Sequence, residues 1–236
     1  MNFKSRKAFF YCINECNEQF RDSHDLHYYR KIIDMHRHYN DLEELLNNES
    51  IYYLIYSTLE KWNMNQQGAR LNNPSIIKKS ILSNKPFLLR LYKYRLESIK
   101  TPMDESDEKA IMTLGLVFKG LDIMKSKRRI VGVSKALHFL LPDLVPPMDG
   151  RYTMSFHYGY NKYDDDIEKE TKTFKDILLK ANGIARKFNL TADDVDGVGW
   201  NTSIPKLIDN AIIGLLKHIE RCGAERTFSI IQSMDY

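Results

Sequence analysis

The chain has 236 residues, of which 43% are hydrophobic and 28% are charged, and its formal net charge is +4. The length is ample for a packed core, and the composition is that of a folded domain, so an intrinsically disordered protein is excluded. A net charge this close to neutral does not by itself indicate a nucleic-acid partner.

No apolar run approaches the roughly 18 residues that a membrane-spanning helix needs, so we expect no membrane partner. The three cysteines, an odd number, argue against a disulfide framework. The basic residues at the start of the chain are not followed by the uninterrupted apolar segment of a signal peptide. We therefore expect a cytoplasmic protein that needs no cofactor.

Apolar residues recur at helical spacing through almost the whole chain, and convincing period-2 alternation is absent. Serines and prolines stand where helices would begin: Ser50, Pro74, Pro86 and Ser203 each precede or open an apolar periodic run. The pattern predicts an all-α fold of roughly ten helices. In chain order the expected helices lie near residues 9–20, 29–36, 50–62, 74–81, 86–95, 105–124, 135–142, 151–160, 171–188 and 203–221.

We expect a single all-α globular domain over residues 1–236, because the connections between the predicted helices are short. The acid-rich stretch at 160–170 is the best candidate for a boundary. It would divide the chain into two lobes, 1–160 with the N-terminal and central helices and 165–236 with the C-terminal helices.

Basic residues gather in two segments. Residues 78–100 hold seven lysines and arginines against one acid, and a second cluster comprises Lys125, Lys127, Arg128 and Arg129. The acids gather elsewhere, so one face of a nearly neutral molecule can be basic.

The segment from Arg128 to Asp149 carries most of the functional information. A turn around Gly132 would point backbone N–H groups toward a phosphate, and Ser134 would cap a helix that begins with Lys135. A lysine at a helix start lies at the positive end of the helix dipole, which favours its neutral, nucleophilic form. Asp149 follows, in the context Met-Asp-Gly-Arg.

This segment resembles the helix-hairpin-helix superfamily of DNA glycosylases and abasic-site lyases. Val131-Gly132-Val133-Ser134-Lys135 matches the hairpin and lysine positions, and Asp149 with Arg151 matches the aspartate position. The resemblance implies a helix-hairpin-helix-like element near 115–141 and a DNA partner. It further implies that Lys135 forms a Schiff base at C1′ of a damaged or abasic nucleotide, with Asp149 as acid or base. The DNA contacts would come from the rest of the motif, Arg128, Arg129, Gly132, Val133, Ser134 and Arg151.

A second, weaker resemblance lies at the end of the predicted helix 50–62. In these glycosylases a turn that contains Asn or Gln inserts polar side chains into the duplex where the target base is flipped out. Asn65, Gln66 and Gln67, with Asn63 before them, could do this. The alternative is an ordinary helix–helix connector, since these residues favour turns.

Structural explanations of the main motif stay open as well. Ser134 would then cap a short helix, Lys135 would be a solvated first-turn residue, and Asp149 would cap the next helix. On that view the protein is a non-catalytic helical module that binds nucleic acid or protein, and whether the chain is an enzyme is undecided at this level.

The cysteines allow either a metal site or a packing role. Cys12, Cys16, His24 and His27 have the spacing C-x3-C-x7-H-x2-H, which invites zinc. The face that carries Cys12 and Cys16 also carries Phe9 and Phe20, so two buried free cysteines and no metal are expected.

Overall fold

The computed structural model describes residues 3–21, 23–39, 41–66, 68–159, 166–224 and 227. Within these ranges the chain forms eleven α-helices and two 3-10 helices, and its only β pairing is a single bridge between Leu71 and Met124. The all-α prediction is confirmed. The helices are α1 (Arg6–Gln19), α2 (His24–His38), α3 (Leu42–Asn47), α4 (Ser50–Lys61), α5 (Pro74–Ser83), α6 (Lys85–Leu91), α7 (Glu105–Gly120), α8 (Ile130–Leu140), α9 (Tyr152–Tyr158), α10 (Ile167–Lys187) and α11 (Ile204–Cys222), with the 3-10 helices η1 (Leu96–Ser98) and η2 (Ala192–Asp194).

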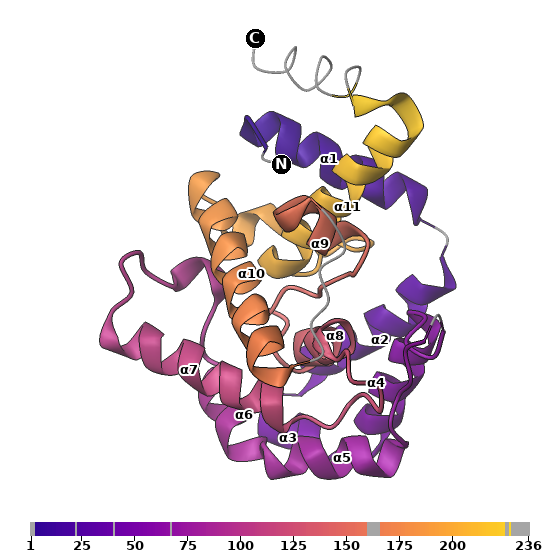
Figure 1. The fold of residues 1–236 in the computed structure, drawn as a ribbon, viewed down its shortest axis with the longest axis vertical. Helices are drawn as coiled ribbons and strands as arrows, with labels where there is room; N and C mark the ends of the chain where they lie inside the picture. Colours follow the sequence, from indigo (N-terminus) through magenta and orange to yellow (C-terminus); the bar gives the residue numbers. More distant parts are fainter. Residues whose placement is uncertain are drawn as a thin grey trace.

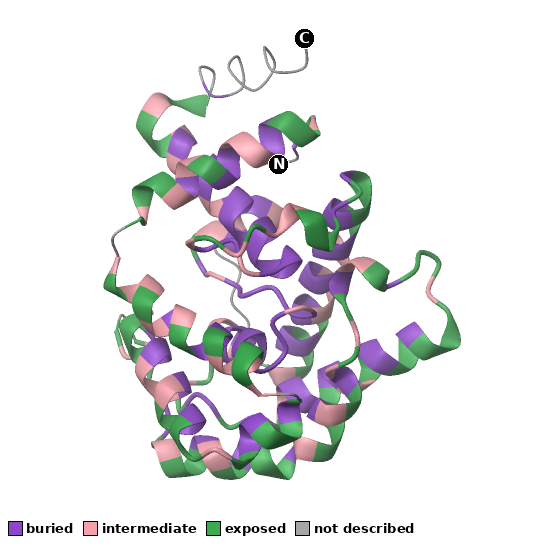
Figure 2. Cartoon of the chain, turned by 180° about the vertical axis from the view of Figure 1, so that it is seen from behind, coloured by how far each residue is buried: buried purple, intermediate pink, exposed green. Residues whose placement is uncertain are grey.

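Helix α8 occupies the middle of the molecule (Figure 1). Ten of its eleven residues are buried, so neighbours surround it on nearly every side. Helices α3, α5, α6 and α7 lie at one end of the molecule, and α1, α9 and α11 lie at the other. Figure 2 shows the buried residues gathered on the inner faces of these helices. The buried hydrophobic residues form one cluster, which extends along the sequence from Phe3 to Leu216.

Side-chain caps fix where many helices begin. A serine or aspartate just before the helix accepts a hydrogen bond from a backbone N–H of the first turn, which satisfies a donor that has no partner inside the helix. Six helices begin in this way, with the caps Ser5, Ser23, Asp41, Asp104, Asp166 and Ser203.

Helices α1 and α11, which lie far apart in the sequence, pack side by side (Figure 1). Gly214 makes this close approach possible, because a Cβ atom there would lie 1.8 Å from the carbonyl oxygen of Cys12. Cys12 and Cys16 are both buried on the same helix α1. Burial raises the pKa of each thiol to about 12, so both are held as neutral thiols.

The main difference from the sequence prediction concerns the start of α8. The helix begins at Ile130, so Gly132 lies inside it, and the expected hairpin turn at Gly132 is wrong. Gly132 serves packing instead, since a Cβ atom there would meet the Met124 Sδ atom at 2.2 Å. Helices α7 and α8 are the two helices within the expected 115–141 element, and residues 121–129 connect them.

Smaller differences concern helix ends. Ser50 is the first residue of α4 and not its cap, and α7 ends at Gly120, four residues before the predicted end. Asp166 starts α10 earlier than expected. The predicted capping box of Thr191 and Asp194 is present, and so is the Ser203 cap of α11. Within the described residues, no helix has the length and apolar character needed to cross a membrane.

Replacing Gly214 with Ala should destabilise the protein. The added methyl group would collide with backbone of α1, and overpacking of this kind lowers the free energy of unfolding by about 1–3 kcal/mol. Chemical denaturation of the purified variant measures the change.

Gly183 in α10 provides the matched control, because nothing lies within 4 Å of a Cβ atom at that position. There, Ala should stabilise the helix by roughly 0.5–1 kcal/mol. Equal effects of the two substitutions would show that the α1–α11 contact is looser than described.

Candidate functional site

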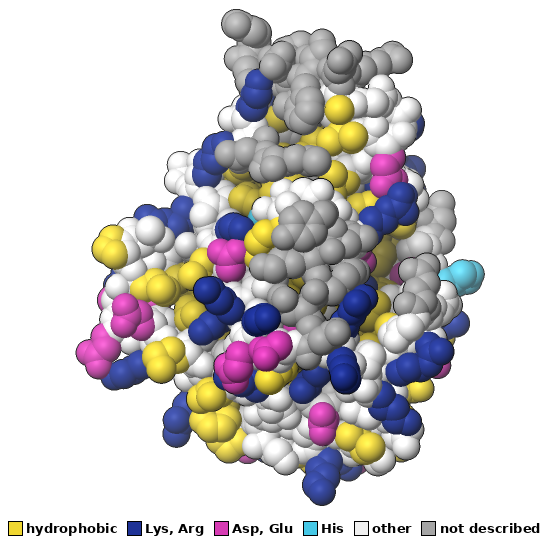
Figure 3. Space-filling view, in the orientation of Figure 1, with side chains coloured by type: hydrophobic (Ala, Val, Ile, Leu, Met, Phe, Trp, Pro, Cys, Tyr) yellow, Lys and Arg dark blue, Asp and Glu magenta, His cyan; other side chains and the backbone are white. Residues whose placement is uncertain are grey.

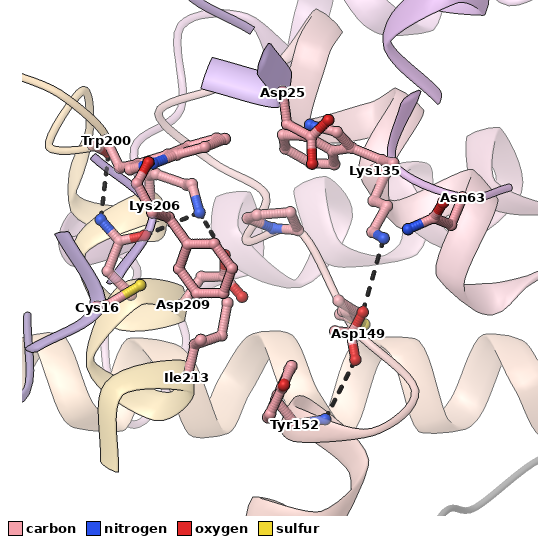
Figure 4. Close-up of a pocket in the computed structure, with 15 residues that line it drawn as sticks. Cys16, Asp25, Asn63, Lys135, Asp149, Tyr152, Trp200, Lys206, Asp209 and Ile213 are labelled. Atoms are coloured by element: carbon pink, nitrogen blue, oxygen red, sulfur yellow. Dashed lines mark hydrogen bonds and ion pairs between the residues drawn. The ribbon is translucent and has the colours of Figure 1, made fainter. Parts of the chain in front are cut away.

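Lys135 and Asp149 come together at a pocket between α2, α8, α9 and α11 (Figure 4). The Lys135 Nζ atom lies 3.7 Å from Asp149 Oδ2, which is an ion pair but is too long for a hydrogen bond. The Lys135 side chain is 9% exposed. Lys135 is the sixth residue of α8 and not its first, so the helix dipole does not activate its amine.

Burial, and not the helix dipole that the sequence suggested, favours the neutral form of the Lys135 amine. Desolvation lowers the pKa of Lys135, and the positive charge of Lys206 acts in the same direction. The carboxylates of Asp149 and Asp209 oppose this shift without reversing it. An amine that is neutral more readily is a better nucleophile.

The segment that carries Asp149 is fixed to α8 by two side chains. The backbone N–H of Met148 donates to Ser134 Oγ at 3.2 Å, and His138 Nδ1 lies 2.7 Å from the Val145 carbonyl oxygen. Since a carbonyl can only accept, His138 carries its proton on Nδ1, and its Nε2 accepts from the Tyr29 hydroxyl at 2.9 Å. Ser134 and His138 therefore set the position of Asp149 relative to Lys135.

Asp149 also holds the turn that leads into α9, two residues before the N-cap Arg151. Its Oδ1 atom accepts hydrogen bonds from the backbone N–H groups of Arg151, at 2.8 Å, and Tyr152, at 3.2 Å. Its own N–H donates to Thr153 Oγ1 at 2.8 Å. The sequence allowed Asp149 to cap the next helix, but the cap position is Arg151, and Asp149 bonds the turn before it while also lining the pocket.

Aromatic rings form one wall of the pocket. Trp62 ends α4, Trp200 lies just before α11, and their ring centroids are 6.0 Å apart. Tyr29 packs behind both, stacked on Trp200 at 5.4 Å. The Trp200 indole N–H donates to the Phe20 carbonyl, whereas the buried Trp62 indole N–H has no hydrogen-bond partner among the described residues. These are the chain's two tryptophans, and both line the pocket.

A second ammonium group lies across the pocket from Lys135 (Figure 4). Lys206 Nζ donates to Asp209 Oδ2 at 2.6 Å and to Asn210 Oδ1 at 2.8 Å, and it lies 4.9 Å from the Trp200 ring centroid. Both members of the Lys206–Asp209 pair are buried. Desolvation raises the pKa of Asp209, and Lys206 partly offsets this. Lys206 is therefore held in place by two short hydrogen bonds, whereas Lys135 makes the long contact with Asp149 and lies 5.4 Å from the Trp62 ring centroid.

The pocket has a volume of about 170 Å³. A cavity of roughly 150 Å³ is known to hold a benzene ring, so this one can hold a flat ring. Two amines and three carboxylates line it, so the charges do not favour a phosphate inside. The carboxylates belong to Asp25, Asp149 and Asp209.

Several residues expected to bind nucleic acid have structural roles. Glu170 Oε1 accepts from the backbone N–H groups of Arg129 and Ile130, at 2.9 and 3.1 Å, and occupies the start of α8 where a phosphate was expected. The Arg129 guanidinium donates to the Leu121 carbonyl. Gly132 and Val133 are buried in the helix. The phosphate-binding turn predicted for residues 132–134 is therefore wrong, since these residues lie inside α8 and the Val133 N–H donates to the Arg129 carbonyl at 2.9 Å.

The Asn/Gln turn follows α4 beside the pocket. Asn63 lines the pocket and has a left-handed backbone conformation, with φ of 62°. Asn65 closes its own loop, accepting from the Leu71 N–H at 2.9 Å and donating to Glu60 Oε1 at 3.3 Å. Gln66 is exposed, and Gln67 lies outside the described residues.

More than half of the basic residues in 78–100 have acidic partners. Four of the basic side chains of residues 78–100 are paired with acids, in the bridges Lys78–Glu49, Lys85–Glu43, Arg95–Asp143 and Lys100–Asp104. On the face shown in Figure 3, lysines and arginines alternate with acidic and hydrophobic side chains. Arg128 is exposed, and Arg151 pairs with Glu220 at 2.8 Å.

Sequence reasoning missed Trp62, Trp200, Lys206, Asp209 and Asp25 as parts of the site. A signal for two of them was present, because Lys206 and Asp209 interrupt an apolar helical run at a spacing of three, which suggests a buried ion pair. Of the described residues, no group of three or more His, Cys, Asp or Glu could hold a metal ion.

Breaking the buried Lys206–Asp209 pair should cost more than breaking a surface pair. Asp209→Asn leaves the Lys206 ammonium without its counterion, and such a loss lowers the free energy of unfolding by about 3–5 kcal/mol. The double variant Lys206→Met with Asp209→Leu should recover much of that loss. Denaturant titration of each variant gives the comparison.

Lys109→Met is the control, because its partner Glu105 is also one helical turn away but both side chains are highly exposed. Its stability should match that of the parent protein. If Asp209→Asn also left the free energy of unfolding unchanged, the Lys206–Asp209 pair would not be buried as described.

The pKa of His138 leads to a pH prediction. Burial lowers this pKa from 6.5 to about 3, so between these values the unfolded chain binds the proton and the folded one does not. The contribution of His138 to stability is complete above pH 6.5 and falls by about 1.4 kcal/mol per pH unit below it. Ring-nitrogen NMR should find His138 neutral at pH 4.5, and a titration midpoint near 6.5 would contradict the burial.

Comparison of the chain with protein-family models, with curated proteins and with solved structures finds no match. The geometry of the pocket is therefore the basis for assigning a function.

Proposed function

We propose that the protein is a DNA-binding enzyme of the base-excision type, a glycosylase or abasic-site lyase with Lys135 as its Schiff-base nucleophile. One observation carries the proposal: a buried amine and a carboxylate meet at 3.7 Å in a pocket walled by two tryptophans. Such a pocket suits a nucleotide turned out of its stack, since the ring can lie on the indoles while C1′ meets the amine.

The reaction begins with the neutral amine. Asp149 takes the proton that Lys135 gives up, and the nitrogen lone pair attacks the C1′ aldehyde carbon of an opened abasic sugar. Loss of the carbonyl oxygen as water leaves a C=N bond between Lys135 and C1′. The lowered pKa of Lys135 supports this role, since a larger fraction of the amine is neutral at physiological pH.

Lys206 is the other amine in the pocket, and it is less suited to this role. Its ammonium donates to both Asp209 and Asn210, so attack on a substrate would require the loss of two short hydrogen bonds. It serves instead as a fixed positive charge beside the two indoles.

Two tyrosines near the pocket support a nucleic-acid substrate. Tyr28 lies one turn after Asp25 on α2, with the amines of Lys31 and Lys61 at 5.8 and 5.9 Å from its ring centroid. Tyr152 lines the pocket with Arg151 and Lys217 beside its ring. Aromatic rings flanked by cations suit stacking of bases next to phosphates.

Borohydride trapping tests the proposal. Duplex DNA with one abasic site and sodium borohydride should give a covalent adduct, because hydride reduces the C=N bond to a stable amine. Peptide mass mapping should place the adduct on Lys135 and not on Lys206. Lys135→Met should abolish the adduct, while Lys119→Met, whose side chain pairs with Glu168 outside the pocket, should leave it unchanged.

Two other outcomes identify the alternatives and overturn the enzyme proposal. Binding that weakens steeply with salt, with no adduct, indicates a non-catalytic nucleic-acid-binding module, because phosphate contacts release counterions. No binding at physiological salt indicates a helical domain that binds protein.

A further inference from the structure

We propose that Asp25 is a second catalytic residue of this pocket, the acid–base group that moves protons on the substrate while Asp149 serves the Lys135 amine. This inference rests on the proposed function, and it concerns which carboxylate of the site performs which proton transfer. Asp25 comes from α2, an element apart from the α8–α9 segment that carries Lys135 and Asp149.

Asp149 is poorly placed for proton transfer to the substrate. One of its oxygens accepts two backbone hydrogen bonds at the start of α9, and the other faces the Lys135 amine. To reach a substrate atom, the Asp149 carboxylate would have to leave these backbone hydrogen bonds and its contact with Lys135. Asp149 is therefore placed to orient Lys135 and to exchange a proton with that amine, and not to reach other atoms of the substrate.

Asp209 is excluded for a related reason. Its Oδ2 atom holds the Lys206 ammonium at 2.6 Å, and both side chains are buried. Proton donation by Asp209 would require breaking this pair, which leaves Lys206 without its counterion.

Asp25 is different. It lines the pocket from the first turn of α2, is half-buried, and its carboxylate accepts no hydrogen bond from the described residues. In Figure 4 Asp25 lies on the opposite side of the pocket from Asp149, and in this view the Lys135 amine lies at a height between the two carboxylates. The charged groups that act on it are Lys135, Lys61 and His24.

Electrostatics supports the assignment. Desolvation raises the pKa of Asp25, and the three neighbouring basic groups counter only part of this effect. A carboxyl group with a raised pKa can be protonated for the acid step and can take the proton back in the base step.

After the Lys135 nitrogen adds to C1′, one of its protons passes to the C1′ oxygen and makes it a hydroxyl. The Asp25 carboxyl gives its proton to this hydroxyl, which leaves as water, and the C=N bond forms. The Asp25 carboxylate then takes the proton from C2′. The electron pair of that C–H bond forms the C2′–C3′ double bond, and the 3′ phosphate leaves with the C3′–O electrons. Asp25 ends protonated, as it began.

Asp25→Asn tests the inference on abasic duplex DNA. Strand cleavage by this variant should fall about 100-fold or more, since positioned acid–base catalysis contributes on the order of 100- to 10,000-fold. DNA affinity should be unchanged, and Asp25→Glu should restore part of the rate. Asp34→Asn is the matched control, because Asp34 lies on the same helix but is exposed and pairs with Arg37. Cleavage by Asp25→Asn within twofold of the parent rate would overturn the inference.

A second probe separates this inference from the proposed function. Propanal with cyanoborohydride should label Lys135 without any nucleic acid, and Asp25→Asn should slow that labelling relative to Asp34→Asn. Labelling that depends on Asp25, with no action on abasic DNA, would keep Asp25 as the acid and remove the nucleic-acid substrate. Labelling of Lys135 at equal rates in both variants would remove Asp25 from the chemistry.

Discussion

The attachment of the segment 141–149 to helix α8 is the constraint on which the pocket depends. Ser134 holds the Met148 N–H and His138 holds the Val145 carbonyl, so backbone on both sides of Pro146 and Pro147 is fixed to one face of α8. Lys135 follows Ser134 in the sequence and Asp149 follows Met148, so these two bonds determine how far apart the amine and the carboxylate lie. The Lys135–Asp149 ion pair is long and buried. These two hydrogen bonds, and not the attraction between its charges, keep the amine and the carboxylate in place.

The surroundings of the buried Lys135 amine are built by residues from several helices. Tyr29 supports both indoles and also bonds His138, so the aromatic wall and the α8 attachment share one side chain. The fixed cation of Lys206 and the carboxylate of Asp149 act on Lys135 in opposite directions. The pKa of the amine therefore depends on its neighbours, on Asp149 before α9 and on Lys206 and Asp209 of α11.

Most of the fold was predictable from the sequence, because local signals set it. The caps Ser203 and Thr191 and the first-turn Pro74 lie where short-range chemistry places helix starts. The start of α8 was not predictable in this way. Its first N–H groups are satisfied by Glu170, which is forty residues further along the chain on α10, so Gly132 looked like a turn residue although it is helical.

The candidate site was predictable only where it depends on residues that are close in the sequence. Lys135 and Asp149 are close in sequence and are joined by a proline-containing segment, so their meeting could be expected from one stretch of chain. Trp62, Trp200 and Asp25 reach the pocket only through the packing of α2, α4 and α11, which no local pattern encodes. The basic residues at 78–100 looked unpaired in the sequence, because their acidic partners, such as Glu43, Glu49 and Asp143, come from other parts of the chain.

The pairing of α1 with α11 has a consequence for when the pocket forms. The pocket takes Cys16, Phe20 and Asp25 from an early part of the chain and Lys206, Asp209 and Ile213 from a late one. A polypeptide emerging from the ribosome holds Lys135 long before α11 exists to enclose it. Until that helix arrives, solvent reaches the Lys135 amine, so the lowered pKa of this group is a property of the completed fold alone.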